Sequence, residues 1–172
     1  MSSIHELGKK ELIDLLNRCW MTHDGVWFYH CLQEFGIEKA NQLNKAAIKS
    51  LAPIEIERIK KALGINNKIE NFQELKEFFE RASPMFIPPF MNASMSFPRK
   101  NVLHWAFEPN KCFAFKGIRR IGAIDQYECG VIYRVACWFD SLGLQYCVTP
   151  SVGRCLMHTS GTCSGDFEFM LH

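Results

Sequence analysis

The sequence predicts an α+β fold in which a helical N-terminal half precedes an antiparallel sheet. Three observations support this prediction. Apolar residues recur at helical spacing over the first 82 residues, prolines become frequent after Ser83, and short strand-like segments follow. Because helices and strands are segregated along the chain, an antiparallel sheet is favoured over a parallel one. A chain of 172 residues can bury a sizeable core, so we expect one domain over residues 1–172.

The helical part, residues 1–82, is expected to hold five helices. Leu12, Leu15 and Leu16 lie along one stripe of the first helix. Thr22 is a suitable N-cap, and Pro53 suits a first turn, where a missing amide costs no hydrogen bond. The predicted ranges are Glu6–Trp20, Thr22–Gly36, Ile37–Leu51, Ile54–Leu63 and Asn71–Arg81, the last opening with an Asn71/Glu74 capping box.

The second part, residues 83–172, is expected to follow the order β-β-α-α-β-β-β and to end in a cysteine-rich segment. Pro98, Pro150 with Gly153, and Ser160-Gly161 mark its turns. The predicted strands are 85–97, 101–108, 145–149, 154–158 and 163–171, and the predicted helices are 110–121 and 130–142.

The bulk composition excludes several classes of function. A formal charge of +2 does not suit a nucleic-acid partner, which requires many phosphates to be neutralised. No apolar run approaches a membrane span, and Met1–Glu6 lacks the basic start of a signal peptide. We therefore expect a cytoplasmic protein that has no membrane partner. Its eight cysteines are then expected to be free, metal-bound or redox-active rather than paired in disulfides.

Three cysteines near the C-terminus are evenly spaced: Cys147, Cys155 and Cys163. A hairpin that turns near Ser151 would place Cys147 opposite Cys155, with about 5 Å between the Cβ atoms. A turn at Ser160-Gly161 would place His158 opposite Cys163. Thiolates and imidazoles at such distances can bind zinc, and Cys129 is an alternative ligand. Buried small apolar cysteines and a redox or nucleophilic thiol are the other interpretations.

The segment Trp20–His30 holds the densest group of reactive residue types in the helical part. His23 and Asp24 can orient a water molecule as a general base or contribute to a metal site. Helix capping and aromatic packing explain the same residues without chemistry. His158 is a further catalytic candidate.

A ligand cavity is expected between the second predicted strand and the helix that follows. His104, Trp105, Cys112 and Arg119 are its candidate lining residues. Methionine and aromatic residues are abundant in this part, as in apolar ligand pockets. An ordinary hydrophobic core has the same composition.

These residues resemble a family of uncharacterised small cytosolic proteins that share a W-M-x-H-D-G-x-W-F motif, here residues 20–28. The similarity continues through residues 36–40 and 58–64. It then includes Cys112 with residues 116–118, and Cys129. The family's terminal Cys…His…Cys pattern corresponds to Cys155, His158 and Cys163, although this chain lacks the proline-rich C-P-P-D-x-H form.

The wider group is similar to L-2-amino-thiazoline-4-carboxylate hydrolase-like proteins and, more distantly, to 4-vinyl-reductase-type ligand-binding domains. In the latter, an α+β domain encloses a small-molecule pocket, and some members hold zinc through late cysteines. The resemblance implies a fold and a pocket but no reaction, because a fold does not determine chemistry.

We therefore expect a cytosolic small-molecule-binding domain with zinc held by Cys155 and Cys163 plus Cys129, Cys147 or His158. A homodimer is also expected. The first alternative is a hydrolase of a small cyclic or amide-like substrate, in which a thiolate or metal-bound water attacks while His23, Asp24 or His158 moves protons. The second is a sensor or interaction module with structural cysteines.

Overall fold

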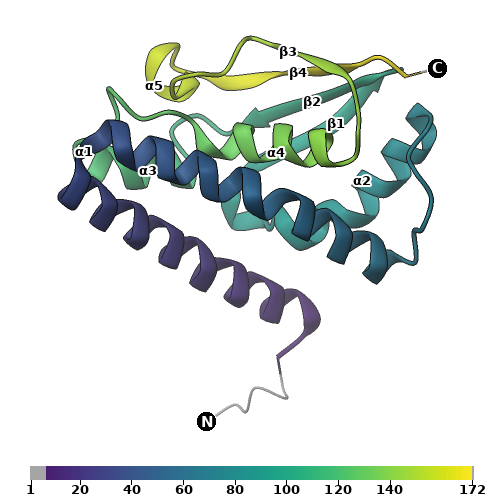
Figure 1. The fold of residues 1–172 in the computed structure, drawn as a ribbon, viewed down its shortest axis with the longest axis horizontal. Coiled ribbons are helices and arrows are strands. Elements are labelled where there is room, and N and C mark those ends of the chain that lie inside the picture. Colours follow the sequence, from purple (N-terminus) through teal and green to yellow (C-terminus); the bar gives the residue numbers. More distant parts are fainter. Residues whose placement is uncertain (1–6, 172) are drawn as a thin grey trace.

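The computed structural model describes residues 7–171 and confirms the α+β fold (Figure 1). A helical N-terminal half precedes a four-stranded antiparallel sheet. The helices are α1 (Lys9–Leu63), α2 (Phe72–Phe86), the 3-10 helix η2 (Pro89–Met91), α3 (Phe113–Arg120), α4 (Gly130–Ser141) and α5 (Leu156–Thr159). The strands are β1 (Ala93–Arg99), β2 (Val102–Phe107), β3 (Tyr146–Thr149) and β4 (Cys163–Phe169). Within residues 7–171, no helix has the length and apolar composition needed to cross a membrane.

Helix α1 consists of two arms that fold back on each other at Gly36, whose φ of 77° and ψ of 171° are not helical. Figure 1 shows the outer arm, residues 9–35, lying outermost, and the inner arm, residues 37–63, running beside α4. A φ and ψ of this kind are essentially restricted to glycine. The chain therefore reverses direction at Gly36, where the sequence predicts a helix end.

Two predicted helix boundaries within α1 are wrong. The Thr22 hydroxyl donates to the Arg18 carbonyl oxygen at 2.8 Å inside a continuous helix, so it does not cap a new one. The inner arm also continues through Pro53, because burial of Ala52 and Ile56 stabilises the turns around it. The predicted start at Glu6 lies outside the described residues. Asn71 caps α2 as predicted, accepting from the Glu74 amide at 3.0 Å.

The strand order is β1-β2-β4-β3, and all neighbours are antiparallel. Two of the predicted strand ranges need correction. The range 85–97 contains the end of α2 and η2 before β1 begins at Ala93, so Pro84 does not end the helix. The range 154–158 is not a strand, because its chain turns into α5, where the His158 amide donates to the Cys155 carbonyl oxygen at 3.0 Å.

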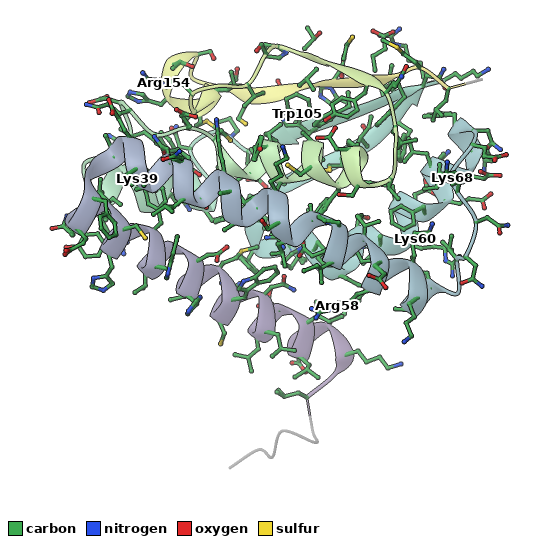
Figure 2. All side chains as sticks on the ribbon, in the orientation of Figure 1. Lys39, Arg58, Lys60, Lys68, Trp105 and Arg154 are labelled. Carbon is green, nitrogen blue, oxygen red and sulfur yellow. The ribbon has the colours of Figure 1, made fainter. Side chains whose placement is uncertain are left out.

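Helix α4 covers the inner face of the sheet, and aromatic rings fill the space between them. The Phe139 ring centroid lies 5.0 Å from that of Phe167 and 4.8 Å from that of Phe169. Trp105 of β2 is fully buried beside Phe167, whereas Arg58 and Lys68 lie on the surface (Figure 2). This buried layer separates the exposed outer face of the sheet from the helices.

Candidate functional site

A cavity of about 240 Å³ lies beneath the outer arm of α1. Its opposite wall comes from α3 and α4, and the end of α2 and strand β1 contribute further residues. The outer arm contributes six residues to the lining: Asn17, Trp20, Met21, Asp24, Gly25 and Phe28. These positions recur at helical spacing, so one face of the outer arm covers the cavity.

The predicted W-M-x-H-D-G-x-W-F segment therefore divides between two faces of the outer arm. Asp24 and Gly25 line the cavity, whereas His23 is exposed on another face and Trp27 is 44% exposed. The predicted leucine stripe also faces outward, since Leu16 is 59% exposed. Asn17 anchors the arm instead: its amide donates to the Met85 carbonyl oxygen at 3.0 Å.

A buried ion pair supports the cavity wall at α4. Arg134 binds the Glu55 carboxylate through both Nε and Nη2, and the Nε–Oε2 distance is 3.2 Å. The Trp138 indole donates to the same carboxylate at 2.8 Å. The Arg134 guanidinium also lies over the Trp20 ring of the outer arm, 4.2 Å from its centroid. Arg134 thus joins both arms of α1 to α4.

Asp24 lies at the mouth of the cavity, on its exposed side. Partial burial raises the pKa of its carboxyl, while the Arg134 guanidinium and His23 oppose this rise. Arg134 is already neutralised by Glu55, so the three charges sum to −1 when Asp24 is ionised. The mouth therefore favours a hydrogen-bond donor or a cation over an anion.

Asn41 of the inner arm fixes the loop that leads into α4. Its side chain donates to the Gln126 carbonyl oxygen at 2.9 Å and accepts from the Glu128 amide at 3.2 Å. Gly130 then begins α4 in close contact with the inner arm, where an added Cβ would lie 2.7 Å from the Asn44 side chain. These contacts determine where Cys129 lies.

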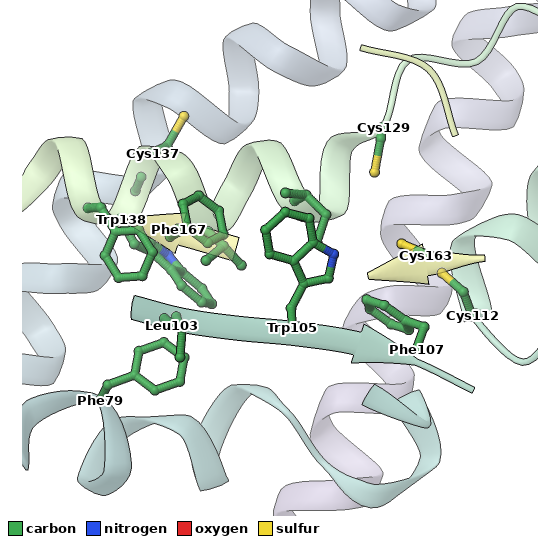
Figure 3. Packing of buried hydrophobic residues seen from close by; sticks show 14 of the residues in the cluster. Phe79, Leu103, Trp105, Phe107, Cys112, Cys129, Cys137, Trp138, Cys163 and Phe167 are labelled. Atoms are coloured by element: carbon green, nitrogen blue, oxygen red, sulfur yellow. The ribbon is translucent and has the colours of Figure 1, made fainter. Parts of the chain in front are cut away.

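Four buried thiols gather behind the cavity wall, each 6% or 7% exposed. They form what we call the thiol cluster: Cys112, Cys129, Cys155 and Cys163. Three of them immediately precede helices α3, α4 and α5, and the fourth begins β4. Figure 3 shows the sulfurs of Cys112, Cys129 and Cys163 facing one another. Charge on Cys155 raises the pKa of Cys112, and charge on Cys112, Cys129 and Cys155 raises that of Cys163.

Burial raises the pKa of every thiol in the cluster, to about 11 for Cys129 and about 12 for Cys163. Negative charge on neighbouring thiols raises the pKa of Cys129 and Cys163 further. A nucleophilic cysteine requires the opposite shift, because only the thiolate attacks. The cluster therefore does not have the electrostatics of a thiol nucleophile. All eight cysteines are free thiols.

Trp105 is fully buried, and its indole N–H has no hydrogen-bond partner. This N–H points toward the thiol cluster (Figure 3), where it lowers the pKa of Cys163. Gly165, opposite Trp105 on β4, makes room for the indole, since an added Cβ would lie 2.4 Å from the ring. The Cys163 sulfur is the acceptor that this N–H faces, although the contact falls short of regular hydrogen-bond geometry.

The predicted metal ligands do not all come together. Cys147 is exposed and pairs with Glu168 of β4, so the predicted Cys147–Cys155 pairing is wrong. The His158 Nε2 atom lies 2.8 Å from the Asp125 Oδ1 atom at the surface. Across residues 7–171, no three His, Cys, Asp or Glu side chains converge closely enough to hold a metal ion as they stand.

The predicted cavity residues also separate. Cys112 belongs to the thiol cluster, Trp105 to the core, and Arg119 to the exposed side of α3. His104 lies on the outer face of the sheet, with its Nδ1 atom 2.7 Å from the Asp166 Oδ1 atom. Ser96 pairs with His104 on the adjacent strand, and neither residue lines the cavity.

Four residues of the site were not predicted from the sequence: Glu55, Arg134, Asn41 and Asn17. Glu55 carried a usable signal, because it lies among Ala52, Ile56 and Ile59 on the apolar face of a predicted helix. A charged residue at such a position requires a buried partner. Arg134, the partner of Glu55, is distant from it in sequence, and so is the loop that Asn41 binds. No pattern in the sequence indicates either contact.

Residues 5–82 match a family of unknown function (DUF6125). The match supports the predicted relation to an uncharacterised family and covers the outer arm that encloses the cavity. It does not support the resemblance to hydrolase-like or 4-vinyl-reductase-type proteins. No curated protein and no solved structure matches the chain.

Proposed function

We propose that the protein binds a small, mostly apolar molecule in the cavity beneath the outer arm of α1. The observation that carries this proposal is the cavity itself, which the outer arm covers with one helical face. Ligand pockets are typically apolar with a few polar groups, and the pockets that bind drug-sized ligands have volumes of about 300–1,000 Å³. A space of about 240 Å³ suits a smaller molecule, such as one with a single ring.

The polar groups at the mouth of the cavity indicate which polar group the ligand carries. Asp24 is exposed there, and the hydrogen bonds of the nearby Arg134 guanidinium go to Glu55. Phe28, Phe113 and the aromatic residues of α4 supply the apolar surface. A ring that carries a hydroxyl or amine group fits this combination, whereas a carboxylate would meet the charge of Asp24. We place this function in the cytoplasm because the cysteines are free thiols.

The test uses three probes that share one ring: benzyl alcohol, benzylamine and benzoate. Binding to the full chain is measured by ligand-observed NMR and titration calorimetry. Benzyl alcohol and benzylamine are expected to bind, and benzoate is expected to bind about fivefold more weakly because of like-charge repulsion of about 1 kcal/mol. Failure of all three probes to bind would refute the proposal.

Variants that fill the cavity test whether the probes bind inside it. Gly117 of α3 lines the cavity, and an added Cβ there meets no atom within 4 Å. Gly117→Leu is therefore expected to fold and to lose probe binding. Gly25→Leu fills the space from the opposite wall. Lys116→Leu, on the exposed side of α3, is the matched control and should bind as the unmodified chain does.

A further inference from the structure

We propose that the protein forms a homodimer in which the outer arms of α1 from two copies pack against each other in antiparallel orientation. The interface uses the face of the arm that points away from the cavity, so it does not depend on the ligand proposed above. Three observations support it: the exposed apolar surface of the arm, the heptad spacing of that surface, and the charges at its two ends.

The outer arm carries most of the exposed apolar side chains of the described residues. Across residues 7–171, ten large apolar side chains are exposed, and seven of them belong to this arm: Leu12, Leu15, Leu16, Val26, Trp27, Tyr29 and Phe35. Figure 1 shows this arm as the outermost element of the molecule. Exposed apolar residues are normally scattered singly over a surface, so their concentration on one element indicates an interaction site.

Exposed side chains along the arm form one straight stripe, which we call the outer stripe. Its members follow each other at alternating intervals of four and three residues, and all are exposed: Leu12, Leu16, Cys19, His23, Val26, His30 and Gln33. This spacing is the heptad pattern by which two helices pack along a shared seam. Asn17, Asp24 and Phe28 lie on the opposite face of the helix and line the cavity. One face of the arm therefore packs on its own chain, and the other is open to a partner.

Charges at the two ends of the outer stripe favour a second copy in antiparallel orientation. Lys9 continues the stripe at the start of the arm, and Glu34 lies beside Gln33 at its end; both charged side chains are exposed. In an antiparallel pair, Lys9 of one copy meets Glu34 of the other, and the two-fold symmetry repeats this contact. In a parallel pair, the lysines would meet each other and so would the glutamates. Charges beside a helix seam select orientation in this way.

The antiparallel alignment also brings the two stripes into register. Leu16 lies opposite Val26 of the partner, and Cys19 lies opposite His23. The arm, residues 9–35, is about 40 Å long and a helix is about 10 Å wide, so two stripes in contact bury on the order of 1,000 Å² in total. This area is close to the lower limit for specific interfaces. We therefore expect a dissociation constant in the micromolar range.

A membrane surface fits the outer arm less well than a second copy does. Amphipathic helices that bind anionic lipids are rich in lysine and arginine. The outer arm carries three basic and four acidic side chains: Lys9, Lys10, Arg18, Glu11, Asp14, Asp24 and Glu34. Arg18 is also paired within the arm, with its Nε atom 2.6 Å from the Asp14 Oδ2 atom. The net negative charge of the arm disfavours an anionic lipid surface.

The main test measures the mass of the full chain in reductant by sedimentation equilibrium, at concentrations from about 1 μM to about 1 mM. We expect a monomer–dimer equilibrium. Leu16→Glu and Val26→Glu should each weaken it at least about hundredfold, because each variant buries an unpaired charge twice in the interface. Ile54→Glu is the matched control: Ile54 is an apolar residue that is 45% exposed, but it lies on the inner arm. This control should dimerise as the unmodified chain does.

A charge exchange tests the orientation of the two arms. Lys9→Glu and Glu34→Lys should each weaken the dimer about fivefold, because like charges then meet. The double variant should recover the affinity of the unmodified chain. A parallel dimer would show no recovery, since residue 9 would meet its own copy in every variant.

Disulfide cross-linking covers the case in which the glutamate variants do not fold. Cys147→Ser first removes the second exposed thiol. In that background, His23→Cys should form covalent dimers with Cys19 under mild oxidation, because the two positions face each other across the seam. A chain that is monomeric over the whole concentration range, a dimer unchanged by Leu16→Glu and Val26→Glu, or cross-linking through Cys19 alone would overturn the proposal. So would binding of a monomer to phosphatidylserine vesicles, which would assign the outer stripe to a membrane surface.

Discussion

The indole of Trp105 links the buried core to the thiol cluster at the scale of one residue. Its N–H has no hydrogen-bond partner, although the ring is fully buried beside Phe167. Burial raises the pKa of Cys163 to about 12, so the indole faces a neutral thiol, which is a weak acceptor. Trp105 therefore contributes to the core through its ring rather than through its polar group.

Glu55 neutralises the guanidinium of Arg134 beside the cavity. Its side chain is 8% exposed and that of Arg134 is 18% exposed, so loss of one partner leaves a buried charge. Glu55→Gln is expected to lower the free energy of unfolding by about 3 kcal/mol. Urea denaturation measures this change, with the exposed Glu57→Gln as control. A loss below about 0.5 kcal/mol, the range of ordinary surface substitutions, would contradict the proposed role of the ion pair.

At the scale of elements, the reversal of α1 at Gly36 decides whether the cavity is covered. The outer arm reaches its position only because the backbone turns there, with φ 77°. No atom lies within 4 Å of an added Cβ, so strain comes from the backbone angles alone. No residue type other than glycine adopts these backbone angles without an energetic cost.

Gly36→Ala is expected to destabilise the chain by about 1–3 kcal/mol, because alanine rarely adopts these angles. Gly25→Ala is the matched control: Gly25 lies inside the regular helix, where alanine is favoured by up to about 1 kcal/mol. Thermal and urea unfolding should therefore shift in opposite directions for the two variants. A stabilised Gly36→Ala chain would show that the outer arm does not require the reversal.

Local patterns predicted most elements but not their junctions. The alternation in residues 101–108 and the cap at Asn71 are local features, and β2 and the start of α2 form as predicted, although α2 continues past Arg81 to Phe86. Pro53 and Thr22 carry equally local signals for helix ends, but packing of α1 on its neighbours overrides them. The strand predicted at 154–158 failed for a related reason, since β3 pairs directly with β4 and leaves that segment free to form α5.

The candidate site was harder to predict because its parts come from distant segments. Asp24 and Cys129 were both identified by residue type. Cys155 and Cys163 were predicted beside Cys129 and lie in the same cluster, whereas His23, predicted to act with Asp24, does not line the cavity. Even spacing suggested Cys147, which lies on the exposed side of β3. Cys112 was assigned to a ligand pocket instead, because only the tertiary fold places the start of α3 beside the starts of α4 and β4.

At the scale of the whole molecule, the cavity and the thiol cluster share one wall. Phe113 and Ala114 line the cavity directly after Cys112, and Tyr127 and Gly130 line it on either side of Cys129. Phe107, opposite Cys163, lines it from β2. Packing of the four thiols therefore also positions the backbone from which these lining side chains project.

Disruption of the thiol cluster is accordingly expected to weaken ligand binding without any change at the cavity mouth. Cys129→Ser leaves a hydroxyl group in the buried apolar cluster and should bind benzyl alcohol about fivefold more weakly, a loss of about 1 kcal/mol. Titration calorimetry measures this change, and Cys147→Ser, at an exposed position of β3, is the control. If the Cys129→Ser chain stays folded and binds the probe with unchanged affinity, the shared wall does not depend on the packing of the cluster.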